Sequence, residues 1–399
     1  SNLELADALQ LNSGSITSTG GTLSFSGGLT MGASGVLDVT GSTLSVSGAL
    51  DLSVGTFSSN SSVLKLEDAA TLSSNSPVSF GSLNLNDKVL TLGSATTQLN
   101  ITDANTALAL SGITLETGDG SLTLSGALSM SSNAKLNSSG GTITLNSGGS
   151  LASGSTLSLP DSTLVLQNAL AISASTLKTK NTTLTTNGKA LSLSAGILEV
   201  EGVQDLSGVS TDGTGTLRLI ANTSLNDNAA LSVGTLDLAD FALTLDDAMA
   251  GLSVSQAVTL DAATEQIISG DADLSLNGGI SVNAGTLSSS GGILSLPGGA
   301  TLVSGASFST SNTTLNLGGS LAVAGTWSGS NTTSISLTTD NASLSSTVPL
   351  SLASLQTNGH DFELASATTD LTIENAFALS GSETLSTRGA DLIFASSAD

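Results

Sequence analysis

The chain has 399 residues, of which only 10% are charged and 2% aromatic, and it contains no cysteine. Its 8 lysines and arginines against 32 aspartates and glutamates give a net charge of −24, which disfavours binding to nucleic acid or to anionic membrane surfaces through a basic patch. The absence of cysteine excludes disulfides and thiolate metal sites, and an apolar fraction of 39% argues against a disordered chain. No apolar run approaches the roughly 18 residues that span a bilayer, so we expect no direct membrane insertion of this segment.

A short alternating phrase recurs along the chain and predicts its local structure. In residues 22–29, 43–52 and 121–128, apolar residues alternate with Ser or Thr, and a glycine interrupts the alternation. Strict alternation indicates a strand that buries one face, and a glycine between two such runs marks a corner. We therefore expect residues 43–52 to form two short strands joined at Gly48.

The spacing of this phrase predicts the architecture. Thr22 and Thr43 are 21 residues apart. Later in the chain, apolar pairs begin at Leu274, Leu294 and Leu315, at intervals of 20 and 21 residues. A period near 20 with no helical pattern is too short for a propeller blade of about 40 residues and is typical of a β-solenoid. The prediction is an all-β parallel β-solenoid of about 19 to 20 coils, each of about 20 residues with three short strands.

The alternation also predicts which side chains point inward, and the composition predicts one domain. The expected structural core includes Leu23, Phe25, Leu44, Val46, Leu50, Leu52, Leu122, Leu124, Leu294, Leu296, Leu315, Leu317, Ile335 and Leu337. Residues 1–399 are expected to form a single elongated domain, a segment of a longer chain. Residues 196–215 alternate less regularly and predict an irregular coil.

Acidic residues in the second half of the chain are candidates for binding calcium. Asp246, Asp247, Asp271 and Asp273 are weak candidate ligands, because acids on neighbouring coils can converge on a hard cation. The sequence has neither an aspartate-rich calcium loop nor the Gly-Gly-x-Gly-x-Asp repeat that binds calcium between coils. Apart from these calcium candidates, we expect no cofactor or metal.

Residues suited to catalysis are few. The single histidine, His360, and the absence of cysteine argue against histidine-based triads and multi-histidine metal sites. Lys178, Lys180 and Lys189 are the only basic residues close together in sequence, and Trp327 is the only tryptophan, which could face outward. We therefore expect no catalytic residues and no enzyme.

Asparagine and threonine patterns allow two further interpretations. Eight asparagines precede a Ser or Thr by two residues, the pattern of a glycosylation acceptor, but asparagine also suits the left-handed backbone of tight turns, which is the favoured interpretation. These asparagines are Asn60, Asn100, Asn137, Asn181, Asn222, Asn312, Asn331 and Asn341. Threonines on a flat solenoid face can also bind ice; adjacent threonine pairs do not recur in one register, so ice binding is a minor alternative.

The repeated phrase also carries a family resemblance. Residues 20–27, 140–145 and 284–287, with Gly-Thr followed by an alternating run, resemble the β-strand repeats of autotransporter passengers and filamentous-haemagglutinin-like adhesins. The resemblance covers nearly the whole chain. It implies a right-handed β-solenoid displayed outside a bacterial cell as a stalk, fibre or adhesive shaft.

The leading hypothesis is a structural extracellular protein of a bacterial surface, whose coils stack end to end with further coils. Its expected partners are other copies of itself or other surface proteins. One alternative is an adhesin module that binds glycans or a host surface. A second alternative is a polysaccharide-acting β-helix enzyme.

Overall fold

The computed structural model describes residues 2–206, 208–226, 229–246, 249–340, 342–379 and 381–395. It divides into two compact units, Ser1–Leu198 and Glu199–Asp399, and the division falls within the stretch predicted to be irregular. Both units are β-solenoids of parallel coils, about 18 in the whole chain and about 21 residues each, slightly longer than the predicted coil. The predicted fold class is thus confirmed.

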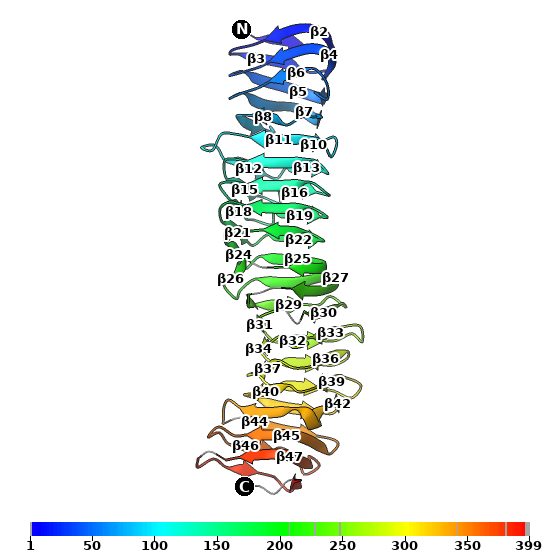
Figure 1. The fold of residues 1–399 in the computed structure, drawn as a ribbon, viewed down its shortest axis with the longest axis vertical. Helices are drawn as coiled ribbons and strands as arrows, with labels where there is room; N and C mark the ends of the chain where they lie inside the picture. The colour runs from blue at the N-terminus through cyan, green and yellow to red at the C-terminus, as the bar shows by residue number, and fades with distance from the viewer. Residues whose placement is uncertain are drawn as a thin grey trace. The chain divides into compact units, whose positions relative to one another are not determined.

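In the first unit, strands of successive coils pair in parallel and lie one above another (Figure 1). The first row of strands is β1 (Leu3–Leu5), β3 (Thr22–Phe25), β5 (Thr43–Asp51), β7 (Val63–Ser73) and β9 (Ser82–Asn84). The second row is β2 (Leu9–Thr17), β4 (Leu29–Asp38), β5, β7, β10 (Leu90–Leu92), β13 (Thr114–Gly118), β16 (Lys135–Ser138), β19 (Thr156–Pro160) and β22 (Thr176–Lys180).

Two further rows complete these coils, and each consists of strands of three or four residues. One row is β12 (Leu108–Ser111), β15 (Leu128–Ser131), β18 (Gly149–Leu151), β21 (Leu170–Ser173) and β24 (Leu191–Ser194). The other is β8 (Val78–Phe80), β11 (Gln98–Ile101), β14 (Ser121–Leu124), β17 (Thr142–Leu145), β20 (Thr163–Leu166) and β23 (Thr183–Thr185), while β6 (Thr56–Ser58) pairs with β4.

The second unit repeats this plan with three rows of parallel strands. The first row is β27 (Thr216–Asn226), β30 (Ala242–Leu245), β33 (Gln266–Ile268), β36 (Thr286–Ser289), β39 (Ser307–Thr310) and β42 (Thr326–Ser328). The strand β29 (Thr235–Asp237) pairs with the beginning of β27, and β30 pairs with its end. The second is β28 (Leu231–Val233), β31 (Leu252–Val254), β34 (Leu274–Leu276), β37 (Ile293–Leu296), β40 (Thr314–Leu317), β43 (Ser334–Leu337), β45 (Leu350–Gln356), β47 (Leu371–Ala378) and β49 (Leu392–Phe394). The third is β32 (Val258–Leu260), β35 (Ile280–Val282), β38 (Ala300–Leu302), β41 (Ser320–Val323), β44 (Ala342–Ser346), β46 (Phe362–Leu364) and β48 (Leu385–Ser386).

Three elements complete the description. They are β25 (Ile197–Asp205), which contains the division between the units, β26 (Val209–Thr211) and the short 3-10 helix η1 (Ser330–Thr332).

The corner predicted at Gly48 is present, but the two strands around it form one continuous strand. Gly48 has φ of 71°, which favours glycine, and the pairing of β5 with β7 shifts register between Val46 and Gly48. Before the corner, Leu44 pairs with Leu23 and Leu64. After it, Leu50 pairs with Leu29 and Leu72, so a single strand contributes to two rows.

Apolar side chains from successive coils line up inside each unit. In the second unit, Leu274, Leu294, Leu315 and Ile335 occupy equivalent positions of four neighbouring strands and are at most 1% exposed. Every residue predicted for the structural core is buried, with at most 5% exposure. Burial of one such leucine contributes about 1.5–3 kcal/mol relative to leaving it exposed, so the stacked rows are the main source of stability.

Candidate functional site

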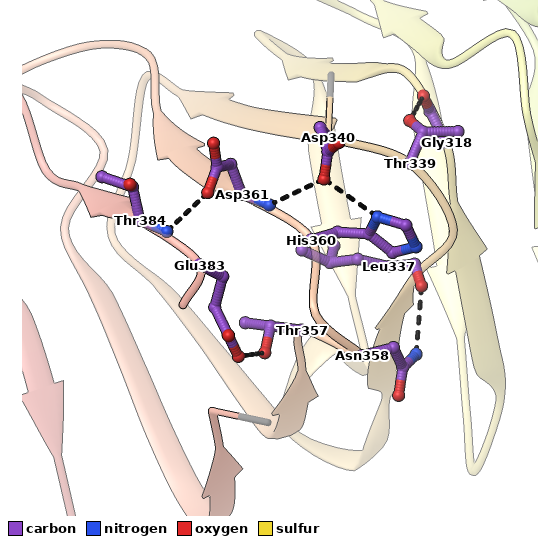
Figure 2. A network of polar contacts seen from close by, with 10 residues as sticks. All are labelled: Gly318, Leu337, Thr339, Asp340, Thr357, Asn358, His360, Asp361, Glu383 and Thr384. Carbon is purple, nitrogen blue, oxygen red and sulfur yellow. Dashed lines mark hydrogen bonds and ion pairs between the residues drawn. The ribbon is translucent and has the colours of Figure 1, made fainter. Parts of the chain in front are cut away.

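A corner of the second unit brings acidic residues and the single histidine together. It is formed where the chain enters β44, β46 and β48 on three successive coils. The Asp340 Oδ1 atom lies 3.0 Å from His360 Nδ1 and accepts a hydrogen bond of 3.3 Å from the Asp361 backbone N–H. One coil further, the Thr384 N–H donates to Asp361 Oδ1 at 2.5 Å. Figure 2 shows these contacts as a ladder that connects the three coils.

Neighbouring polar groups of the same region make further contacts between coils (Figure 2). The Asn358 Nδ2 atom donates to the Leu337 carbonyl at 3.0 Å, and the Thr357 hydroxyl donates to Glu383 Oε1 at 2.6 Å. Asn358 has φ of 53° and precedes Gly359, so the chain turns tightly just before His360. The turn places His360 beside Asp340, its hydrogen-bonding partner.

An open hollow of about 410 Å³ lies beside this ladder. Its lining consists of Asp340, Ala342, Ser343, Asp361, Phe362, Glu363, Thr384 and Ser386. Three of these residues are acidic, and the Glu363 carboxylate pairs with the Arg388 guanidinium, with 3.2 Å between Arg388 Nη2 and Glu363 Oε2. The arrangement therefore combines three carboxylates with one imidazole and one guanidinium.

Hydrogen bonding favours the ionised form of Asp340. The hydrogen bond with the His360 side chain is the main reason that the pKa of Asp340 lies below its ordinary value of 3.8, and the bond from the Asp361 N–H acts in the same direction. Its side chain is 69% exposed, so solvent screens the pair. The Asp340 carboxylate thus makes charge-assisted hydrogen bonds to two groups of the next coil, the His360 ring and the Asp361 N–H.

The calcium candidates do not form a metal site in the part of the chain that the structure describes. Asp246, Asp271 and Asp273 are exposed, and Asp273 Oδ1 accepts a hydrogen bond of 2.8 Å from the Ile293 N–H. Asp247 lies outside the described residues. Within those residues, no group of three or more His, Asp or Glu side chains could hold a metal ion.

A second group of charges occupies three coils of the second unit. Arg218 on β27 lies opposite Asp237 on β29, with 2.8 Å between Arg218 Nε and Asp237 Oδ2. Its Nη1 atom also lies 3.6 Å from Oε1 of Glu199, whose side chain is only 11% exposed. The hydrogen bond to Asp237 is the main cause that raises the pKa of Arg218. The irregular coil predicted for residues 196–215 contains Glu199, but this group of charges was not predicted. The signal that identifies it is the 19-residue spacing of Glu199, Arg218 and Asp237.

Buried hydroxyl groups close the corners of the coils, and sequence analysis missed them. In the first unit, the Ser162 hydroxyl is 3% exposed, donates to the Pro160 carbonyl at 2.9 Å and lies 3.0 Å from the Ser138 hydroxyl. In the second, Thr313 is 1% exposed and donates to the Ser289 carbonyl at 3.0 Å. Buried polar groups need such partners. The sequence contains a signal, a Ser or Thr that recurs directly before the alternating run of successive coils.

The remaining predicted residues have structural surroundings. Trp327 is only 8% exposed, stacks on Phe308 with ring centres 5.0 Å apart, and donates from Nε1 to the Thr310 hydroxyl at 2.8 Å. The expectation that Trp327 could face outward is therefore wrong, because its ring fills the inward position of β42. Lys178 and Lys180 lie on the outward face of β22, and Lys189 lies in the turn that follows β23.

The asparagine triplets do not share one conformation. Asn181 and Asn312 have the left-handed backbone predicted for turns, with φ of 49° and 53°. Asn100, Asn137 and Asn222 instead lie within the strands β11, β16 and β27, so for them the turn interpretation is wrong. Asn341 lies outside the described residues.

Comparisons with protein-family models, with curated proteins and with solved structures find no match to this chain. In the described part of the chain, no helix has the length and apolar character needed to cross a membrane. The β-solenoid repeat architecture is what the structure establishes, and the functional role follows as a proposal.

Proposed function

We propose that this chain is a structural segment of an extracellular bacterial surface protein, in which stacked coils supply length and stiffness. The observation that supports this proposal is the parallel pairing of strands from coil to coil within each unit. Each coil contacts its neighbours along several strands, so bending a unit would break many backbone hydrogen bonds together. The surface location rests on the resemblance of the repeated phrase to adhesin repeats.

The charged residues support a structural role because they connect coils. Asp340 connects to His360 and Asp361, and Arg218 connects to Asp237, in each case about one coil away. The same applies to the hydroxyl contact between Ser138 and Ser162. Groups that could otherwise act on a substrate are thus used to join one coil to the next.

The proposal includes stacking of end coils on further coils or on another copy of the chain. Leu3 on β1 is 41% exposed, and Ile393 and Phe394 on β49 are 50% and 40% exposed. Apolar side chains beside a strand edge favour the addition of another strand. An added coil would cover Leu3 and Phe394, which pair with the buried Leu23 and Ile373 of the neighbouring coils.

Electron microscopy of the purified chain tests the structural role. We expect stiff, elongated particles, and compact globules would contradict it. For the stacking part, the double substitution Ile393→Lys and Phe394→Lys should abolish end-to-end association. Ile220→Lys is the matched control, since Ile220 is 38% exposed within β27. Particles that never associate would overturn the stacking part alone.

A further inference from the structure

One sheet of the first unit presents threonines in two aligned rows, which we call the threonine face. The first row contains Thr142, Thr163 and Thr183, and the second contains Thr123, Thr144, Val165 and Thr185. They come from β14, β17, β20 and β23, whose pairings contain no shift of register. Adjacent threonine pairs do not reveal these rows, because the threonines that align within one strand are separated by one inward residue.

The hydroxyls of this face are not used to hold the fold together. Thr142, Thr144 and Thr163 are half-buried, and among the described residues their hydroxyls have no hydrogen-bonding partner. Corner hydroxyls behave differently, as Thr182 donates to the Leu159 carbonyl at 2.5 Å. The hydroxyls of the face are therefore available to an external ligand.

The spacing of the rows sets the distances between the outward groups of this face. Neighbouring strands are about 4.8 Å apart, and residues two apart on one strand are separated by about 6.7 Å. The face is thus a two-dimensional lattice of hydroxyl and methyl groups. Threonine is branched at Cβ, which restricts χ1 and keeps the lattice regular.

The side chains of the face argue against two classes of ligand, polyanions and crystalline polysaccharides. Its outward residues on these four strands carry no charge, in a chain whose net charge is −24. A neutral face gives no attraction for nucleic acid or other polyanions. No aromatic ring is available on it for stacking against sugar rings, which disfavours crystalline polysaccharide.

We propose that the threonine face binds the surface of ice. The hydroxyls would take the place of water oxygens in the ice surface, and the methyl groups would order the water between the rows. This activity is independent of the proposed structural role, because it uses only the outward side chains of one sheet.

Ice recrystallisation and thermal hysteresis, measured on the whole chain, test the proposal. We expect the chain to suppress recrystallisation and Thr144→Tyr to abolish the effect, because the ring stands above the lattice between Thr123 and Val165. Thr144→Val should keep most of the activity, as Val165 already occupies the same row. The control is Ser150→Tyr, an exposed outward position in β18 of the same coil, which should leave the activity unchanged.

Unchanged thermal unfolding of the tyrosine variants would show that the fold is intact. No effect of the whole chain on ice, or equal loss in Thr144→Tyr and Ser150→Tyr, would overturn the proposal. So would binding to microcrystalline cellulose or chitin without an effect on ice. Dimers in ultracentrifugation that Thr144→Tyr abolishes would instead identify the face as a contact between two copies.

Discussion

Ser138 and Ser162, 24 residues apart in the chain, share a hydroxyl–hydroxyl hydrogen bond of 3.0 Å inside a corner of the first unit. The Ser162 hydroxyl also accepts the Gly140 backbone N–H at 3.0 Å. Both serines are at most 3% exposed. At this corner, the Ser162 hydroxyl therefore makes hydrogen bonds to the Gly140 N–H and the Pro160 carbonyl that water would otherwise make.

Replacing Ser162 by alanine should therefore destabilise the first unit. The substitution takes a hydrogen-bond partner from the buried Ser138 hydroxyl and from the Pro160 carbonyl, and such a loss costs about 1–3 kcal/mol. Urea unfolding followed by circular dichroism measures the change. Ser150→Ala, at an exposed position, is the control and should change the free energy of unfolding by less than about 0.5 kcal/mol. Equal effects of the two substitutions would contradict the buried role.

The core rows make a second prediction. Leu44 is 0% exposed, so Leu44→Ala should cost about 2–5 kcal/mol. Leu44→Asp should cost more, because it buries an unpaired charge. Thermal unfolding checks both, with the outward Thr43→Ala as control. Unchanged thermal stability of Leu44→Asp would contradict the inward orientation of this position.

Arg218 and its two acidic partners differ in burial, and this difference is testable. Asp237→Asn should cost only about 0.2–1 kcal/mol, because both side chains of that pair are 38% exposed. Arg218→Gln should cost more, since it also removes the cation beside Glu199, whose side chain is only 11% exposed. Urea unfolding at low and high salt measures both. An Asp237→Asn variant as unstable as Arg218→Gln would contradict this order.

Stability at low pH should depend on the contact between Asp340 and His360. The folded-state pKa of Asp340 is below 3.8, so its contribution to stability is present above pH 3.8 and is lost as pH falls through the lowered value. His360→Gln removes the main cause, and we expect the pKa of Asp340 to rise toward its ordinary value. Carboxyl titration by NMR measures it. Asp38 is the internal control, because Thr40 lowers its pKa and the substitution leaves that bond intact. An unchanged pKa of Asp340 in His360→Gln would contradict the assignment.

Trp327 provides a spectroscopic test of the interior of the second unit. As the only tryptophan, buried against Phe308, it should emit at short wavelength and resist quenching by acrylamide. Trp327→Ala should cost about 3–5 kcal/mol, and Trp327→Phe less. Emission typical of an exposed tryptophan would contradict its inward position.

Much of the fold follows from alternation and period because both are local properties of the sequence. Leu44 and Leu315 could be assigned to the core because each lies between two polar residues in an alternating run. The position of the corner at Gly48 was equally readable. Continuity of the strand through that corner was not, because it depends on pairing with Leu29 and Leu72 from other coils.

The contacts of the candidate site could not be predicted from the sequence as the core positions could. His360 was noticed, but its contact with Asp340 depends on how many residues each corner contains. The threonine rows were missed for a related reason: an alignment of Thr142 with Thr163 requires the exact register of the strands. The inward ring of Trp327 was also not predictable, since a Trp in a short polar stretch suits either face of a strand.

The pairing of β17 with β20 has a consequence for how such chains change in length. Thr142 aligns with Thr163, so excising residues 142–162 would place every following inward residue above the same kind of neighbour. A loss of one residue within a strand would instead turn the leucines of that strand toward solvent. We therefore expect this chain to accept the insertion or deletion of a whole coil more readily than that of a single residue within a strand.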